Sequence, residues 1–436
     1  MKTLNIRLWF AFLLIALIPA IQNIVRLHFI GEMPNDWGFN IASQIQWLSI
    51  IYEVIKEGLL IPLFYMLFLS YKQDNKKLEN NTLSGLFIVF IIHIMISTLI
   101  FIFTNDLLDQ VSLNNQLKEE TNIYIKLESI AILFSISSEY LIIYLATLGK
   151  IKEMLWFSII KSFLLILTDT LLISNNIYSM NLGVNGIAIS NIIINLILSI
   201  YIIFKSELLR NIDKYNKLLD IQWLTSWFKL GAFSGLESLI RNAVFFIMIL
   251  SMMNKIGEQG TFWITNSIIW GILLAPSMAL AEVVKRDIAK DYKNIIHNTR
   301  YYLLAIIIFS SLWLISIPIW EPFLFKVLKI NNHLVIHLMI IQTTFYIIFM
   351  FNNSILDATL IGLGLTKYIL LQSIIVNIGY YSIVYALYKQ NYIEMNLDNI
   401  AYIFGGGMIV DMIPSIWLYK KAIKKYNINL KQIIFR

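Results

Sequence analysis

The stretch Leu86-Phe87-Ile88-Val89-Phe90-Ile91-Ile92 is an uninterrupted apolar run, and runs of this kind decide the fold of the chain. A helix at ~1.5 Å per residue needs about 20 apolar residues to cross the hydrocarbon core of a bilayer. Blocks of this length fall at roughly 8–30, 41–70, 83–104, 121–148, 152–174, 183–204, 226–253, 261–284, 301–320, 333–362, 366–388 and 396–419. A membrane barrel would show short alternating segments instead. We therefore predict an all-α polytopic membrane protein with twelve transmembrane helices.

The composition excludes several other classes of protein. The 436 residues are 58% hydrophobic and 14% charged, whereas soluble domains carry about 25% charged residues. The absence of cysteine removes disulfides, zinc–thiolate sites and thiol catalysis. Only His333 and His337 have the helical spacing of metal ligands, and we interpret them as an interfacial pair without a metal. With no nucleotide-binding motif and no catalytic triad spacing, the sequence predicts neither an enzyme nor a cofactor.

The distribution of lysine and arginine predicts the orientation. With the N-terminus inside, 24 of the 34 basic residues fall in inside segments and five in outside loops. Because cytoplasmic loops retain basic residues, we expect both termini in the cytoplasm. The same asymmetry accounts for the net charge of +7, so no nucleic-acid partner is needed to explain it.

An internal repeat predicts two halves. Leu145–Lys152 resembles Leu360–Lys367 at an offset of 215 residues, and Ile18–Arg26 resembles Phe233–Arg241 at the same offset. Six helices return the chain to its starting side, so both halves enter the membrane in the same direction. We expect an N-terminal six-helix lobe at 1–215, a cytoplasmic linker at about 205–225 and a C-terminal six-helix lobe at 216–436, around a central cavity.

Charged residues inside the predicted spans are the candidate site, because a charge at the bilayer centre costs roughly 2.5–3.5 kcal/mol and usually faces a partner or a cavity. Glu53 with Lys56, and Glu237 with Arg241, lie one helical turn apart and could neutralise each other. The remaining residues of this kind are Arg26, Glu57, Lys126, Glu128, Glu139, Lys161, Asp169, Asp357 and Asp411.

Arg26 and Asp169 are our first choices among these charges. Arg26 lies about fifteen residues into its span with no acid in helical reach, so its partner must come from another helix or from a substrate. Asp169 lies within the fifth span, eight residues after Lys161. The alternative is a buried structural ion pair. Most aromatic residues, such as Trp223, Trp227, Trp320 and Trp417 near span ends, we expect in interfacial belts.

The chain resembles the multidrug and toxic compound extrusion (MATE) transporters of the wider flippase superfamily. The resemblance rests on Leu148-Gly149-Lys150, Ile166-Leu-Thr-Asp169, the Gly183–Asn191 segment, Gly231-x-x-x-Gly235-Leu-Glu237 and Gly362-Leu-Gly364-Leu-Thr-Lys367. It implies two six-helix lobes around a cavity, and export of amphipathic, often cationic, compounds driven by sodium or proton gradients. No cofactor is implied beyond Na⁺ or H⁺ as coupling ion.

Carried over by residue, the resemblance implies a cation site formed by Asp169 and Asn191, where the pattern usually has threonine. The chain departs from the pattern at Leu165, where asparagine is usual, and at Arg26 in Val25-Arg26-Leu27-His28-Phe29-Ile30-Gly31, where aspartate is usual. A guanidinium is not deprotonated in proteins. We therefore expect Arg26 to pair with Asp169 in place of the coupling ion. Coupling would then fall to Glu53, Glu57, Glu237 or Asp357, and Lys56 and Arg241 complete the candidate substrate- and ion-binding residues.

Two other functions stay open. A flippase for an anionic lipid-linked saccharide would use Arg26, Lys56 and Arg241 on a pyrophosphate, and a positively charged cavity would favour it. A membrane-embedded enzyme or receptor is the third possibility. The leading prediction is an exporter, a monomer in the bacterial cytoplasmic membrane whose partners are the lipid bilayer and a small amphipathic organic substrate.

Overall fold

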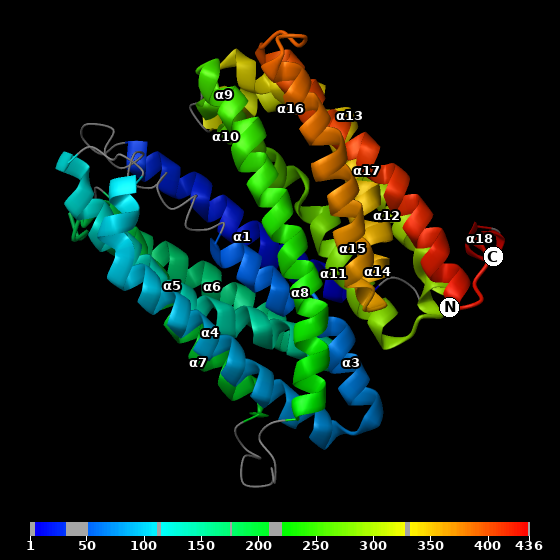
Figure 1. The fold of residues 1–436 in the computed structure, drawn as a ribbon. Helices are drawn as coiled ribbons and strands as arrows, with labels where there is room; N and C mark the ends of the chain where they lie inside the picture. The colour runs from blue at the N-terminus through cyan, green and yellow to red at the C-terminus, as the bar shows by residue number, and fades with distance from the viewer. Residues whose placement is uncertain are drawn as a thin grey trace. The chain divides into compact units, whose positions relative to one another are not determined.

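The computed structural model of this chain describes residues 5–31, 51–110, 115–174, 177–208, 220–327 and 332–434. Every regular element in these ranges is a helix, as Figure 1 shows. Among these residues, ten helices are long and apolar enough to cross a membrane. The pair Ile264–Leu273 and Ala275–Lys290, bent by 52°, passes the same test when its two helices are taken together, and a shorter apolar helix covers Ile6–Ile21. Each of the twelve predicted segments therefore contains a helix, which confirms the all-α, multi-pass membrane fold.

The described chain forms two compact units. Unit 1 consists of Met1–Ala20, Glu57–Tyr65 and Trp227–Arg436, and unit 2 of Ile21–Lys56 and Met66–Ser226. The boundary between lobes that the repeat predicts near residue 215 stays a prediction.

Unit 2 is built around α5. Both α1 (Ile6–Gly31) and the helical span at Ile51–Gln73, which includes α3 (Leu63–Gln73), are divided between the two units. The helices wholly in unit 2 are α4 (Asn75–Gln110), α5 (Asn115–Leu148), α6 (Ile151–Leu172) and α7 (Gly183–Ser206). Figure 1 shows α4 to α7 side by side, with α5 packed on α4 and α7. Ser138 of α5 and Ser199 of α7 bring their hydroxyl oxygens to 3.0 Å, so small polar residues allow these helices to approach closely.

Unit 1 contains the remaining helices and all five π-helical segments of the described chain. They are α8 (Ile221–Val244), η3 (Phe245–Leu250), α9 (Ser251–Lys255), α10 (Gln259–Ile268), η4 (Ile269–Leu273), α11 (Ala275–Lys290), α12 (Asn294–Pro322), η5 (Phe323–Val327), α13 (His333–Phe351), η6 (Asn352–Asp357), α14 (Ala358–Gly362), α15 (Thr366–Ser373), η7 (Ile374–Tyr381), α16 (Ser382–Lys389), α17 (Leu397–Lys425) and α18 (Leu430–Ile434). The first residues of α8, Ile221–Ser226, fall in unit 2.

The repeated glycine motif produces the same turn twice. Gly149 ends α5 with φ +74° and Gly364 ends α14 with φ +71°, a left-handed conformation that favours glycine. The amide of Lys150 donates to the Leu145 carbonyl at 2.9 Å, and that of Leu365 donates to the Leu360 carbonyl at 2.9 Å. These paired closures are those of helices that end at a left-handed residue, so the sequence repeat is also a structural one at this position.

Connections in unit 1 gather at two ends. At one end, the ring of Tyr292 between α11 and α12 lies 5.1 Å from that of Tyr426 after α17. Lys421 of α17 lies over the ring of Tyr368 in α15, 5.9 Å from its centre. The connection before α12, the one before α15 and the end of α17 therefore share one end, as the predicted topology requires.

The other end carries the intervening connections. The amide of Asn332, before α13, donates to the Thr261 hydroxyl of α10 at 3.1 Å. The ring Nε2 of His337 lies 2.9 Å from Asp398 at the start of α17. The distribution of basic residues predicts that these loops lie together outside the membrane, and their contacts with one another agree with that alternation.

The Gly231-x-x-x-Gly235 motif allows a close helix crossing. A Cβ atom at Gly58 would lie 3.3 Å from the Gly231 carbonyl oxygen and 3.4 Å from the Gly235 Cα, and a Cβ at Gly231 would overlap the Gly58 carbonyl. Beside this crossing the buried indole of Trp227 donates to the Leu59 carbonyl at 2.9 Å. The glycines thus bring the helix that carries Glu57 against α8.

The expected aromatic belt is wrong for three tryptophans. Trp223, Trp227 and Trp320 are buried, at 7%, 1% and 5% exposure, whereas Trp417 is 53% exposed. Each buried indole donates to an oxygen inside the protein: to Met66, to Leu59 and to the Ser316 hydroxyl. A buried indole N–H needs a hydrogen-bond acceptor. Oxygens inside the protein supply that acceptor here, so these tryptophans do not need to lie at the membrane surface.

We predict that Gly231→Ala lowers the free energy of unfolding by about 1–3 kcal/mol, the usual cost of overpacking, because the added methyl overlaps the Gly58 carbonyl. Thermal unfolding in detergent measures this. Gly379→Ala in η7 is the matched control, since a Cβ there meets nothing within 4 Å. Equal stability of the two variants would contradict the crossing.

Candidate functional site

Asp169 in unit 2 lies beside side-chain hydroxyl groups. It is in the last turn of α6 and 5% exposed. The hydroxyl of Ser190 in α7 donates to its Oδ1 at 2.8 Å, and the Thr168 and Ser190 hydroxyls are 2.6 Å apart. Ser190 is not among the sequence candidates. Arg26 belongs to α1, but its side chain lies outside the described residues, so its pairing with Asp169 stays a prediction.

Asn191, the neighbour of Ser190, contacts a different acid. Its amide donates to Glu128 of α5 at 2.5 Å, and Glu128 is 7% exposed. Successive residues of a helix point about 100° apart, so Ser190 and Asn191 address different neighbours. The position of Glu128 near a span end suggests a side chain that reaches the membrane surface, and the structure buries it against α7 instead.

A third group of charges in unit 2 surrounds Glu139 of α5. Lys56 lies 2.5 Å from its Oε2, and Ser135 donates to its Oε1 at 3.1 Å. Lys161 of α6 is an electrostatic neighbour of the same carboxylate. The structure therefore connects Lys56 to an acid on another helix, beyond the Glu53 that sequence spacing suggests.

In unit 1, Arg241 bridges two carboxylates. Its Nε donates to Glu237 at 3.1 Å and its Nη2 donates to Glu57 at 2.7 Å. The pair with Glu237 is the one-turn pair that the sequence suggests, and the bond to Glu57 depends on the glycine crossing. The exposed fractions of these side chains are 42% for Arg241, 23% for Glu57 and 10% for Glu237.

A second polar network of unit 1 connects Asp357 to Asp411. The Asn352 amide of η6 donates to Asp411 Oδ2 at 2.7 Å, and the Gln372 amide of α15 donates to Asp357 Oδ2 at 3.4 Å and also bonds Asp411. Asn352 and Gln372 are 1% and 4% exposed. Glu237 is an electrostatic neighbour of both aspartates.

Three oxygens in this network have no donor within the part of the chain that the structure describes: Asn352 Oδ1, Asp357 Oδ1 and Gln372 Oε1. Buried acceptors of this kind are rare in folded proteins. Together with the Asp411 carboxylate they can accept a proton or surround a monovalent cation with oxygen ligands. The described residues hold no group of three His, Cys, Asp or Glu side chains suited to a metal, so any cation here would depend on the amide oxygens.

Sequence reasoning names Asp357 and includes Asp411 only as a membrane charge, and it misses Asn352 and Gln372. Asn352 and Asp357 are the two ends of the π-helical η6, and Gln372 directly precedes Ser373 and η7. A π turn inserts a residue and rotates the later residues of the helix relative to α-helical register, and such turns are frequent at functional sites. A 3.6-residue pattern therefore could not place these side chains on one face.

The charges of the unit 1 network are predominantly acidic. Among the described residues, ion pairs and electrostatic interactions connect five carboxylates and two bases. The carboxylates are Glu57, Glu237, Glu282, Asp357 and Asp411, and the bases are Arg241 and Lys285. An excess of acidic groups favours protons and cations over anions.

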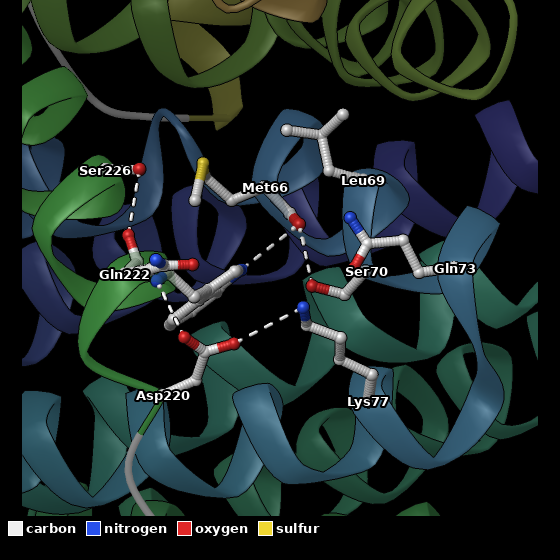
Figure 2. Close-up of a pocket in the computed structure, with 9 residues that line it drawn as sticks. Met66, Leu69, Ser70, Gln73, Lys77, Asp220, Gln222 and Ser226 are labelled. Carbon is white, nitrogen blue, oxygen red and sulfur yellow. Dashed lines mark hydrogen bonds and ion pairs between the residues drawn. The ribbon is translucent and has the colours of Figure 1, made fainter.

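A surface pocket of about 180 Å³ lies in unit 2 where α8 begins. Figure 2 shows Lys77 and Asp220 pointing toward one another across it, with 3.5 Å between Nζ and Oδ2. The indole of Trp223 donates to the Met66 carbonyl at 3.3 Å. None of its nine lining residues is a sequence candidate. Its polar side chains bind one another, so they hold the start of α8 against the end of α3.

Solved structures reveal the relatives of this fold. A crystal structure of MATE in complex with MaD3S aligns with a TM-score of 0.78 at 15% identity over 96% of each chain. The chain has the fold of the MATE transporters. An outward-facing multidrug resistance MATE family transporter of the MOP superfamily aligns with a TM-score of 0.74 at 16% identity, as does a mutant of the Vibrio cholerae MATE transporter VcmN, both over 96% of each chain.

Sequence comparison alone does not reach these MATE structures. No family model matches the chain, and no curated protein matches its sequence. At 15–16% identity the likeness establishes the MATE fold, and the resemblance predicted from short motifs is confirmed at that level.

Proposed function

We propose that this chain is a secondary active efflux transporter that exports small amphipathic organic compounds by alternating access. The MATE fold supports this proposal, since one relative of that fold is described as a multidrug resistance transporter. The acidic network around Asp357 and Asp411 is the observation that carries it, because a pump driven by an ion gradient needs buried groups that bind and release a cation.

The network suggests how coupling would work. A proton or a sodium ion bound among Asp357, Asp411, Asn352 and Gln372 would cancel one of the two negative charges of the neighbouring carboxylates and give a partner to an oxygen that lacks a donor. Release of the ion would leave two neighbouring negative charges in a site that is shielded from water, and this costs free energy. Binding from one side and release to the other would therefore bias the two halves between their two orientations. Glu237 interacts electrostatically with both aspartates and is bonded to Arg241, so a change in the charge of the aspartates would also act on the group formed by Glu237, Arg241 and Glu57.

The charge balance favours an exporter of cationic or neutral compounds over a flippase. A pyrophosphate needs converging basic groups, but Arg241 is already bonded to Glu57 and Glu237, and Lys56 to Glu139. The unit 1 network is acidic in total. A saccharide flippase is therefore the second candidate, supported only by the presence of these basic residues.

In unit 2 we propose that Arg26 pairs with Asp169 and replaces a coupling ion there. The buried carboxylate of Asp169, to which Ser190 donates, supports this proposal, because a buried acid usually has a partner of opposite charge. We further propose that the protein is a monomer of the bacterial cytoplasmic membrane with both termini in the cytoplasm, as the distribution of basic residues suggests.

Asp357→Asn and Asp411→Asn should each reduce gradient-driven transport at least tenfold, because an amide cannot exchange a proton or balance a cation. Uptake into proteoliposomes under an imposed proton or sodium gradient, with a panel of cationic, neutral and anionic compounds, measures this. Glu394→Gln makes the same acid-to-amide change in an exposed loop and should transport normally. Unchanged transport by both aspartate variants would exclude this coupling site, and transport of anions alone would favour the flippase.

Arg26→Ala should change the ion dependence of transport in the same assay, because Asp169 would then be free to bind a proton or sodium ion. The expected result is a new or stronger dependence on one gradient. Transport with unaltered rate and ion dependence would show that Arg26 does not replace a coupling ion.

The orientation can be tested with single cysteines, since the natural chain has none. A cysteine at the exposed Gln390 should react with a membrane-impermeant maleimide in intact cells, whereas one at the exposed Lys424 should react only after permeabilisation. The reverse pattern would invert the proposed topology.

A further inference from the structure

Unit 1 has a strongly basic end. Four lysines, Lys420, Lys421, Lys424 and Lys425, are exposed on the last turns of α17, and Lys367 is exposed at the start of α15. No acidic residue occurs between residues 412 and 436. With 29 residues, α17 is about 44 Å long at ~1.5 Å per residue, so its last turns extend beyond a hydrocarbon core of about 30 Å.

Two of these lysines converge on one aromatic ring. The Nζ atoms of Lys367 and Lys421 lie 5.7 Å and 5.9 Å from the centre of the Tyr368 ring. Lys421 also lies 5.3 Å from the ring of Trp417. Neither lysine pairs with a carboxylate among the described residues. Two ammonium groups that pair with no carboxylate of the described residues therefore lie beside one phenol, whose hydroxyl can itself donate a hydrogen bond.

Along the face of α17 that leads to Lys421, the side chains change from apolar to charged in the same order as the parts of a phospholipid. Ile409, Ile413, Trp417 and Lys421 follow one another at intervals of four, so they form one stripe along the helix. The first three are 44%, 69% and 53% exposed. Along the stripe the surface is aliphatic, then amphipathic at Trp417, then cationic, which is the order of acyl chain, interface and phosphate in one leaflet.

We propose that Lys367, Lys421 and Tyr368 bind the phosphate of an anionic phospholipid whose acyl chains lie along Ile413 and Trp417. The two lysines are positively charged, so the site favours an anionic headgroup. The apolar stripe beside them favours a lipid over free phosphate, because only a lipid has acyl chains to cover it. The neighbouring Lys420, Lys424 and Lys425 add long-range attraction to an anionic leaflet. This inference does not depend on the transport proposal, since it concerns the membrane-facing end of unit 1.

Native mass spectrometry of the full chain in detergent tests the site, with phosphatidylglycerol and phosphatidylcholine of identical acyl chains as probes. We expect preferential binding of phosphatidylglycerol. Lys367→Gln/Lys421→Gln should weaken it about thirtyfold, equal to ~2 kcal/mol, because each lysine near an anionic surface contributes about 1 kcal/mol. Lys367→Arg/Lys421→Arg keeps both charges and should retain the preference.

Lys76→Gln/Lys152→Gln is the matched control, because it removes two exposed lysines of the same predicted side and should leave the affinity within about twofold. Gel filtration and thermal unfolding verify that every variant is folded. An equal loss in the control, equal binding of the two lipids, or unchanged affinity of the glutamine variant would overturn the proposal. Displacement of the lipid by equimolar inorganic phosphate would do the same, since it would identify a site for free phosphate.

Discussion

Hydrocarbon offers no partner for a charge or for a backbone hydrogen bond, and the described structure depends on that constraint. Helices satisfy the backbone internally, which is why the apolar blocks are helical. Charged side chains then find partners on other helices: Lys56 contacts Glu139, Arg241 contacts Glu57 and Glu237, and Asp411 contacts Asn352. Close crossings make these contacts possible, and the glycines at Gly58 and Gly231 provide one of them.

One network of unit 1 does not fully satisfy this constraint, and the proposed function rests on it. Around Asp357, three buried oxygens lack a donor in the described chain, although the same network contains amide groups that could have been oriented otherwise. The π-helical segments gather in the same unit. Extra residues in a helix are costly and are retained where side chains must be aimed, which connects the irregular backbone with the acidic network that it presents.

Sequence reasoning succeeds where a single helix decides the outcome. The Glu237–Arg241 pair follows from one-turn spacing, and the turns at Gly149 and Gly364 follow from glycine. It fails where two helices decide. Ser190 rather than its neighbour donates to Asp169, because the rotation of α7 against α6 selects the residue. Trp227 has the sequence position of a lipid-facing anchor but is buried, because its acceptor is a carbonyl on a distant part of the chain.

By itself the sequence determined the all-helical membrane fold, the alternation of the loops and the resemblance to MATE transporters, since these depend on segment length, basic residues and glycine spacing along one chain. Only the tertiary structure decided that Gln372 bonds both Asp357 and Asp411, that Asn352 bonds Asp411, and that Lys367 and Lys421 share Tyr368. Those contacts join residues from separate helices, and π-helical insertions change which way the side chains of η6 point. No local pattern encodes the packing rotation of one helix against another.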